Sequence, residues 1–231
     1  MPMHISYAKK ELTDKLRASQ PAKAALAQGT QYSLLVRNRS AQPWLFYVYQ
    51  KLPSLQANIF SLAWFCSPYQ IQVGDQIRFT WEIDYNFIWS DTGVLIPGVD
   101  FEAWGMKDCS PDGKNTTEFS AGTAPGLSQP VQAPPSGSLV VKDADNVPNN
   151  KFSVGLGMSG TGTYCVQAGT NLTHTFTPTP SYWVAAGTNL KIGTVLSINT
   201  ITQTAEAKFP SAVYSLDCVL QDNNEWDIQP A

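Results

Sequence analysis

The segment from Gln76 to Trp89 constrains the fold more than any other part of the chain. Its alternating apolar residues are Ile77, Phe79, Trp81, Ile83, Tyr85, Phe87 and Trp89. Because side chains alternate across a strand, this spacing puts the bulky groups on one face and nearly all the polar groups on the other. A helix would scatter them around its circumference. The segment predicts one long strand, or two strands with a bend near Asp84-Tyr85.

Shorter runs repeat the two-residue rhythm along the rest of the chain. Expected strands cover residues 32–37, 44–50, 139–142, 152–156, 173–177, 182–185, 191–200 and 205–209. Phe60, Leu62, Trp64 and Cys66 are predicted to form one apolar face of a further strand, and residues 214–228 a closing hairpin. Residues 120–137, rich in Pro and Gly, indicate a surface loop. Residues 30–231 are therefore predicted to form one all-β domain, an antiparallel β-sandwich of the jelly-roll or immunoglobulin-like kind.

Residues 1–29 have a different period from the rest of the chain. Ile5, Leu12 and Leu16 recur at helical spacing, with charged side chains on the opposite face. Pro21 stops this helix and can open a short second one. We expect a short helical N-terminal arm that lies on the domain surface or, alternatively, docks on a neighbouring molecule.

The chain contains few charged residues. Only 14% of its residues are Asp, Glu, Lys or Arg, whereas an average domain has about 25%. The formal net charge of -3 gives no attraction to a phosphate backbone, so nucleic acid is not an expected partner. Weak mutual repulsion permits self-association.

The N-terminal segment contains no apolar run typical of a secretory signal, and no stretch is long enough to span a bilayer. We therefore expect a cytoplasmic protein, with leaderless export as the alternative. Cys66, Cys109, Cys165 and Cys218 lie far apart, without a Cys-x-x-Cys pair. Buried, reduced thiols fit the cytoplasmic expectation, and two disulfides are the alternative if the protein is exported.

The segment Gly155-Leu156-Gly157-Met158-Ser159-Gly160 has the spacing of a dinucleotide-binding loop. Such a loop opens a helix, but strand-forming residues follow here, so we interpret it as a glycine-rich bend and expect no cofactor. Ser159 lacks the flanking pattern of a nucleophile elbow. His174 is the one histidine in the predicted domain, and we interpret it as a surface strand residue, with a Ser-His-Asp arrangement as the alternative.

Acidic residues supply weak candidates for other chemistry. Asp108, Asp112 and Glu118 could bind calcium, as could Asp222, Asn224 and Asp227, but both sets fit solvated turns and lack EF-hand spacing. Glu82 and Asp84 share one strand face, as the carboxylates of a glycosidase could, although alternation alone explains them. We expect neither a metal site nor an enzyme.

Aromatic residues exceed what one core requires. Exposed Trp and Tyr side chains stack on sugars and favour membrane interfaces. The candidate ligand-binding residues are Trp44, Trp104, Tyr182 and Trp183.

Several stretches resemble the bacterial rhizosphere-induced protein family. The most specific is Ser61-Leu62-Ala63-Trp64-Phe65, supported by the 79–85 and 155–160 segments and by Phe176-Thr177-Pro178 with Tyr182-Trp183. The resemblance covers roughly residues 30–229 and excludes the arm. It implies a root-colonising bacterial setting with density-dependent expression, and it supplies no catalytic residue.

Two functional hypotheses follow. The first is a non-enzymatic protein that acts through protein contacts and assembles with its own copies into an oligomer or larger particle. The alternative is a lectin-like or toxin-like module that binds a glycan or lipid surface of a host.

Overall fold

The computed structural model describes residues 30–52, 58–197, 201 and 203–231, and this part of the chain forms strands without any helix. The strands are β1 (Gln31–Asn38), β2 (Leu45–Lys51), β3 (Ile59–Ser61), β4 (Phe65–Cys66), β5 (Gln76–Glu82), β6 (Tyr85–Ser90), β7 (Gly105–Cys109), β8 (Thr116–Ser120), β9 (Gly126–Leu127), β10 (Leu139–Asp143), β11 (Ser153–Met158), β12 (Thr161–Gln167), β13 (Thr173–Phe176), β14 (Ser181–Gly187), β15 (Thr204–Glu206), β16 (Ser215–Leu220) and β17 (Trp226–Pro230). The all-β class is confirmed. The expected helical arm lies outside the described residues.

Four sheets divide the strands. Sheet I has the order β17-β16-β1-β5, sheet II β15-β14-β2-β4, sheet III β3-β12-β11-β6-β7 and sheet IV β13-β10-β8-β9. Two pairings, β1 with β16 and β8 with β10, are parallel, so sheets I and IV are mixed and the expected antiparallel arrangement is confirmed only in part. Parallel neighbours need a long connection, and the chain supplies one because β16 returns to β1 only after most of the sequence.

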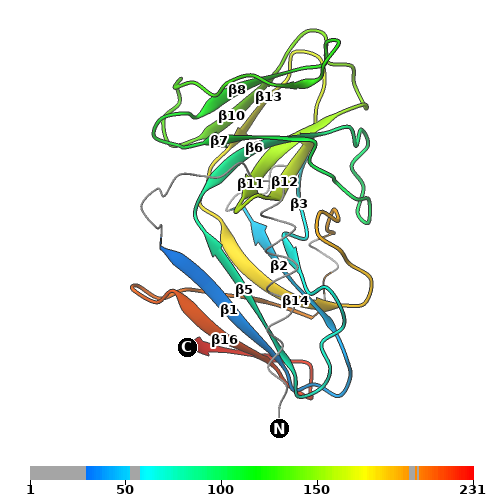
Figure 1. Cartoon of the computed structure of the whole chain (residues 1–231), viewed down its shortest axis with the longest axis vertical. Coiled ribbons are helices and arrows are strands. Elements are labelled where there is room, and N and C mark those ends of the chain that lie inside the picture. Colours follow the sequence, from blue (N-terminus) through cyan, green and yellow to red (C-terminus); the bar gives the residue numbers. More distant parts are fainter. Residues whose placement is uncertain (1–29, 53–57, 198–200, 202) are drawn as a thin grey trace.

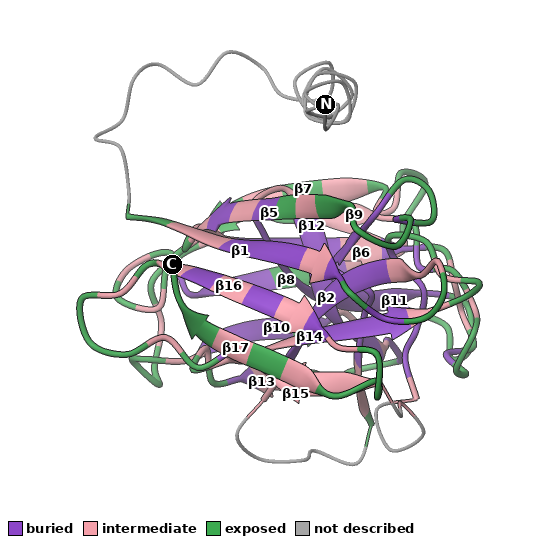
Figure 2. Ribbon diagram, turned by 90° about the horizontal axis from the view of Figure 1, so that it is seen from below, coloured by how far each residue is buried: buried purple, intermediate pink, exposed green. Residues whose placement is uncertain are grey.

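The buried apolar side chains form two large hydrophobic cores, which lie at different positions along the molecule. The first core takes side chains from sheets I and II, including Val36, Phe46 and Trp81. The second core takes side chains from sheets III and IV, including Phe87 and Phe119. Sheets III and IV lie at one end of the long axis and sheets I and II at the other (Figure 1). In Figure 2, buried and more accessible residues alternate along β16 of sheet I.

The alternating segment connects the two cores. It forms two strands, β5 and β6, with a break at residues 83–84, as the predicted bend requires. Phe79 and Trp81 enter the first core, Phe87 enters the second, and Tyr85 packs against both. Ile83 was expected to share the buried face, but it is 49% exposed because the bend turns it outward.

The turn between β11 and β12 stabilises the bend between β5 and β6 through hydrogen bonds. Ser159 and Gly160, at the tip of the β11–β12 hairpin, both have positive φ, as a tight two-residue hairpin turn requires. The Ser159 N–H and Oγ donate to Asp84 Oδ1 at 2.6 and 3.2 Å. The preceding residue, Met158, is buried in the first core, and its carbonyl accepts from Trp64 Nε1 at 2.9 Å. The glycine-rich segment is thus a strand-to-strand turn, which confirms its structural interpretation.

Glycines let a further layer of side chains pack on the outer face of sheet III. Leu62, Ile88 and Phe101 belong to a small buried cluster on that face. A Cβ at Gly162 would lie 2.8 Å from Leu62 Cδ1 and 3.0 Å from Ile88 Cδ1. The missing side chain therefore provides the space that this layer occupies.

Two predicted strands were wrong. Residues 60–66 form parts of β3 and β4 in different sheets, and their alternating side chains enter different clusters: Leu62 faces the layer on sheet III, whereas Trp64 faces the first core. Within the predicted strand 191–200, residues 191–197 form a looped segment that contributes isolated bridges at Thr194 and Val195. Apolar spacing alone could not reveal either outcome, because a loop can also bury every second side chain.

We expect Gly155→Ala to destabilise the fold by about 1–3 kcal/mol or more. A Cβ at Gly155 would collide with the backbone oxygen of Tyr164, which the β11–β12 pairing holds in place. Urea unfolding would measure the effect. Gly113→Ala is the matched control, because a Cβ there meets nothing within 4 Å, and it should change stability by less than about 0.5 kcal/mol. Equal stabilities for the two variants would contradict the prediction.

Candidate functional site

The four candidate aromatic residues do not form one site. Tyr182 and Trp183 are neighbours on β14, and because side chains alternate they occupy opposite faces of sheet II. Tyr182 packs against the first core, with its ring centroid 5.0 Å from that of Trp81. Trp44 also packs against the first core, and its buried indole nitrogen has no hydrogen-bond partner among the described residues. These two rings stabilise the interior.

Trp183 lies half-buried on the other face of sheet II. Lys51 Nζ is 3.4 Å from its ring centroid, a cation–π contact, and Tyr49 stacks beside it at 6.2 Å. Its indole Nε1 donates to Ser181 Oγ at 2.9 Å. The lysine covers the ring face that a sugar would need, so Trp183 offers a poor stacking surface.

Trp104 is the one candidate aromatic that faces solvent. Its side chain is 62% exposed, and its indole Nε1 donates to Asp91 Oδ1 at 2.8 Å, which fixes the orientation of the ring. Three other large apolar residues of the same stretch are also exposed, namely Val94 (55%), Ile96 (55%) and Met106 (40%). We call Val94, Ile96, Trp104 and Met106 the exposed apolar segment.

No sequence pattern indicated that Val94, Ile96 and Met106 lie at the surface. Leu95 and Phe101, between them in the chain, are buried in the cluster on sheet III. The loop is thus held to sheet III by the buried side chains of Leu95 and Phe101, while Val94 and Ile96 face solvent. The candidate arm residues Ile5, Leu12 and Leu16 lie outside the described residues.

His174 has a buried acidic partner that the sequence did not reveal. Its Nε2 lies 2.9 Å from Asp143 Oδ2, and the two side chains are 9% and 0% exposed. The expectation of a surface histidine was wrong, because His174 is opposite Val141 in the β10–β13 ladder, on the face directed to the second core. Asp143 Oδ2 also accepts from the Gly169 N–H, while Oδ1 has no partner among the described residues.

Ser159 does not complete a catalytic triad with this pair. Its Oγ accepts from the Glu82 N–H at 3.0 Å, and its single proton is shared between the Glu82 carbonyl at 3.0 Å and Asp84 Oδ1 at 3.2 Å. His174 instead bonds Asp143, across sheet IV. The serine hydroxyl therefore maintains the bend between the cores.

The four cysteines are free, which confirms the prediction of reduced thiols. Cys66, Cys165 and Cys218 are buried and Cys109 is half-buried. Burial raises the pKa of Cys66 and of Cys218 to about 12, with Asp217 contributing to the shift of Cys218. These thiols stay protonated at neutral pH, so they are weak nucleophiles and weak metal ligands.

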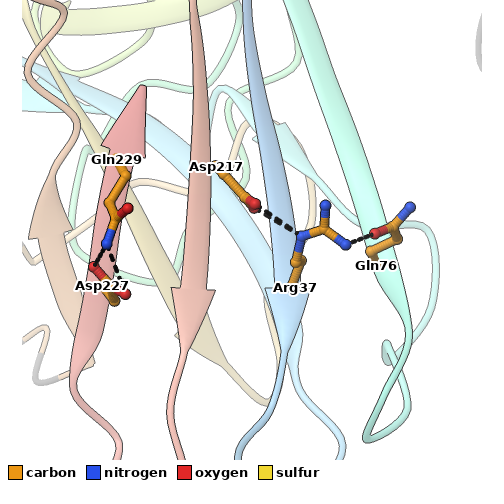
Figure 3. A network of polar contacts seen from close by, with 5 residues as sticks. All are labelled: Arg37, Gln76, Asp217, Asp227 and Gln229. Atoms are coloured by element: carbon orange, nitrogen blue, oxygen red, sulfur yellow. Dashed lines mark hydrogen bonds and ion pairs between the residues drawn. The ribbon is translucent and has the colours of Figure 1, made fainter. Parts of the chain in front are cut away.

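One member of each acidic set considered for calcium is engaged within the protein. Asp108 Oδ1 accepts from Asn86 Nδ2 at 2.8 Å. Both oxygens of Asp227 accept from Gln229 Nε2, next to the Arg37–Asp217 ion pair on the outer face of sheet I (Figure 3). Within the part of the chain that the structure describes, no three His, Cys, Asp or Glu residues form a metal-binding group, and no helix could span a membrane.

Comparison with known proteins identifies the family. The RhiA family model matches residues 29–231. The chain belongs to the RhiA family. It is 71% identical to Protein RhiA of Rhizobium leguminosarum bv. viciae over 231 residues, which cover all of both chains. No solved structure matches it. The resemblance inferred from the Ser61–Phe65 stretch is confirmed, and that stretch in this RhiA family member joins β3 to β4.

We expect His174→Ala to destabilise this RhiA family member by about 3–5 kcal/mol, because it leaves the buried Asp143 carboxylate without its partner. Adding Asp143→Asn should recover part of that loss, because the amide oxygen still accepts from Gly169 while the buried charge is gone. Urea unfolding of the single and double variants would measure both effects. A double variant less stable than His174→Ala would contradict the buried-charge explanation.

Stability should fall in alkaline solution. Folding raises the pKa of the Cys66 thiol from 9.0 to about 12, so the folded state retains a proton that the unfolded chain releases. The contribution is complete below pH 9 and decreases by about 1.4 kcal/mol per pH unit as pH rises toward 12. Urea unfolding between about pH 7.5 and about pH 10.5 would measure the slope. Cys66→Ala should show a shallower decline than the unsubstituted protein, and parallel curves would refute the assignment.

Proposed function

We propose that this RhiA family member acts without catalysis, by associating with its own copies through the exposed apolar segment. The proposal rests on the observation that Trp104 is 62% exposed in a stretch of chain with three further exposed apolar residues. Tryptophan is enriched among the residues that dominate binding energy in protein interfaces. The low content of charged residues supports the same proposal, because it weakens repulsion between copies.

The neighbouring edge strand adds a second means of contact. Sheet III ends at β7, which pairs with β6 on one side only. Met106 is exposed on β7, two residues from Trp104. An edge strand presents unpaired backbone groups to a partner, so a second copy could hydrogen-bond to β7 while covering the indole.

The non-enzymatic part of the proposal is supported by the engagement of the candidate reactive groups. The Ser159 hydroxyl, the His174 ring and the carboxylate of Asp84 all hold the fold together. The free thiols support action in a reducing compartment. We further propose that each pair of sheets enclosing a core is a β-sandwich.

A second function, glycan binding, is favoured by the contact between Trp104 and Asp91. Sugar sites combine an exposed aromatic face with a polar group at its edge that accepts from hydroxyls. The indole Nε1–Asp91 Oδ1 bond at 2.8 Å places a carboxylate at the edge of this exposed ring. The same residue therefore carries both candidate functions, and the two must be separated by experiment.

Trp104→Lys should weaken self-association at least about tenfold, because it replaces an apolar contact by a charge. Sedimentation equilibrium over a range of protein concentrations would measure the dissociation constant. Val131→Lys is the matched control, since Val131 is 58% exposed outside the segment and its substitution adds the same charge. A protein that stays monomeric at the highest concentration, or equal effects of both substitutions, would refute the proposal.

A glycan array probed with the full chain, Trp104→Ala and Asp91→Asn would test the second function. If glycans bind at the indole, both variants should lose at least about tenfold in affinity, because stacking and the oriented hydrogen bond act together. Val131→Lys should retain binding. The absence of any glycan bound by the unsubstituted protein would exclude this function without affecting the test of self-association.

A further inference from the structure

A hollow lies on the outer face of sheet II. It has a volume of about 760 Å³, within the range of about 300–1,000 Å³ typical of small-molecule sites. Tyr47 of β2 lines it together with Leu190 and Leu196, which follow β14 in the chain. Tyr47 and Leu196 belong to the buried cluster on this face, and Leu190 packs against that cluster. These side chains give the hollow an apolar wall, which lies beside polar lining residues such as Thr188, Asn189 and Thr194.

Tyr47, which lines the hollow, carries a hydroxyl group. The residue is only 3% exposed, yet its hydroxyl bonds to no described residue. Tyr49, two positions along the same strand, differs in this respect because its hydroxyl lies 2.9 Å from Thr204 Oγ1. Burial raises the pKa of Tyr47 above its usual value, so this hydroxyl keeps its proton and can donate to a ligand.

The charged groups that line the hollow neutralise each other. Lys191 Nζ lies 2.6 Å from Asp100 Oδ2, and both side chains are accessible to solvent, at 71% and 46%. A carboxylate ligand would compete with Asp100 for the ammonium group, and it would be costly to desolvate beside Leu190 and Leu196. The charge balance thus favours a neutral ligand.

We propose that this hollow binds a small neutral amphiphile, with an apolar chain along Leu190 and Leu196 and one carbonyl oxygen that accepts from the Tyr47 hydroxyl. The apolar wall stabilises the chain by removing it from water, and the Tyr47 hydroxyl selects the polar end. Pro97, Gly98 and Asp100, which also line the hollow, lie in the chain between Ile96 and Trp104, whereas none of the four residues of the exposed apolar segment lines it.

Octanamide is a suitable probe, because it joins a seven-carbon alkyl chain to a neutral amide. Isothermal titration calorimetry with the full chain should detect its binding, while octanoate should bind at least about tenfold more weakly because its charge must be desolvated. Acetamide, which lacks the chain, should not bind measurably. Equal affinities for octanamide and octanoate would overturn the assignment of a neutral ligand.

Two pairs of variants locate the site. Tyr47→Phe should weaken octanamide binding about fivefold by removing one hydrogen bond, whereas Tyr49→Phe should leave it unchanged. Leu190→Asn should weaken it at least about tenfold, with Leu172→Asn, an exposed leucine distant in sequence, as the control. Thermal unfolding would verify that each variant folds. No heat of binding, or the same affinity in Tyr47→Phe and Tyr49→Phe, would overturn the proposal.

Discussion

The contact between the Ser159 turn and the bend at Asp84 holds the two halves of the molecule in register. β5 ends in the first core and β6 begins in the second, so only two residues of chain separate them. Such a short connection would act as a hinge if nothing braced it. Asp84 accepts from the Ser159 backbone and hydroxyl, and Met158, next in the chain, inserts into the first core. Hydrogen bonds and apolar packing therefore both stabilise the bend between β5 and β6.

Side chains in the interior of the molecule contribute mainly to its stability. Glycines on β11 and β12 let Leu62 and Ile88 approach sheet III, which closes its outer face. Asp143 and His174 pair with each other within the fold, and the buried Cys66 thiol remains protonated at neutral pH. We therefore propose that this protein interacts with other molecules at its surface, where the exposed Trp104 and the hollow beside Tyr47 lie.

Among the candidate aromatics, sequence reasoning selected Trp104 correctly as a solvent-facing residue but could not separate it from Trp44, Tyr182 and Trp183. All four occur in stretches of similar composition, and exposure depends on which segment covers each ring. Lys51 covers Trp183, and the first core receives Tyr182 and Trp44. The sequence could not predict the Asp143–His174 pair either, because the two residues are 31 positions apart. They meet only when β10 pairs with β13.

The sequence by itself determined the strand character of the chain, the bend near Asp84 and the family, because side-chain alternation and short motifs are local properties. Only the tertiary structure decided which surface each strand face meets. It divided residues 60–66 between two sheets and exposed Ile83. It also placed β16 parallel to β1, across 182 positions from Ser33 to Ser215. A period of two specifies two faces, but the partner of each face depends on contacts between distant segments, which no local pattern encodes.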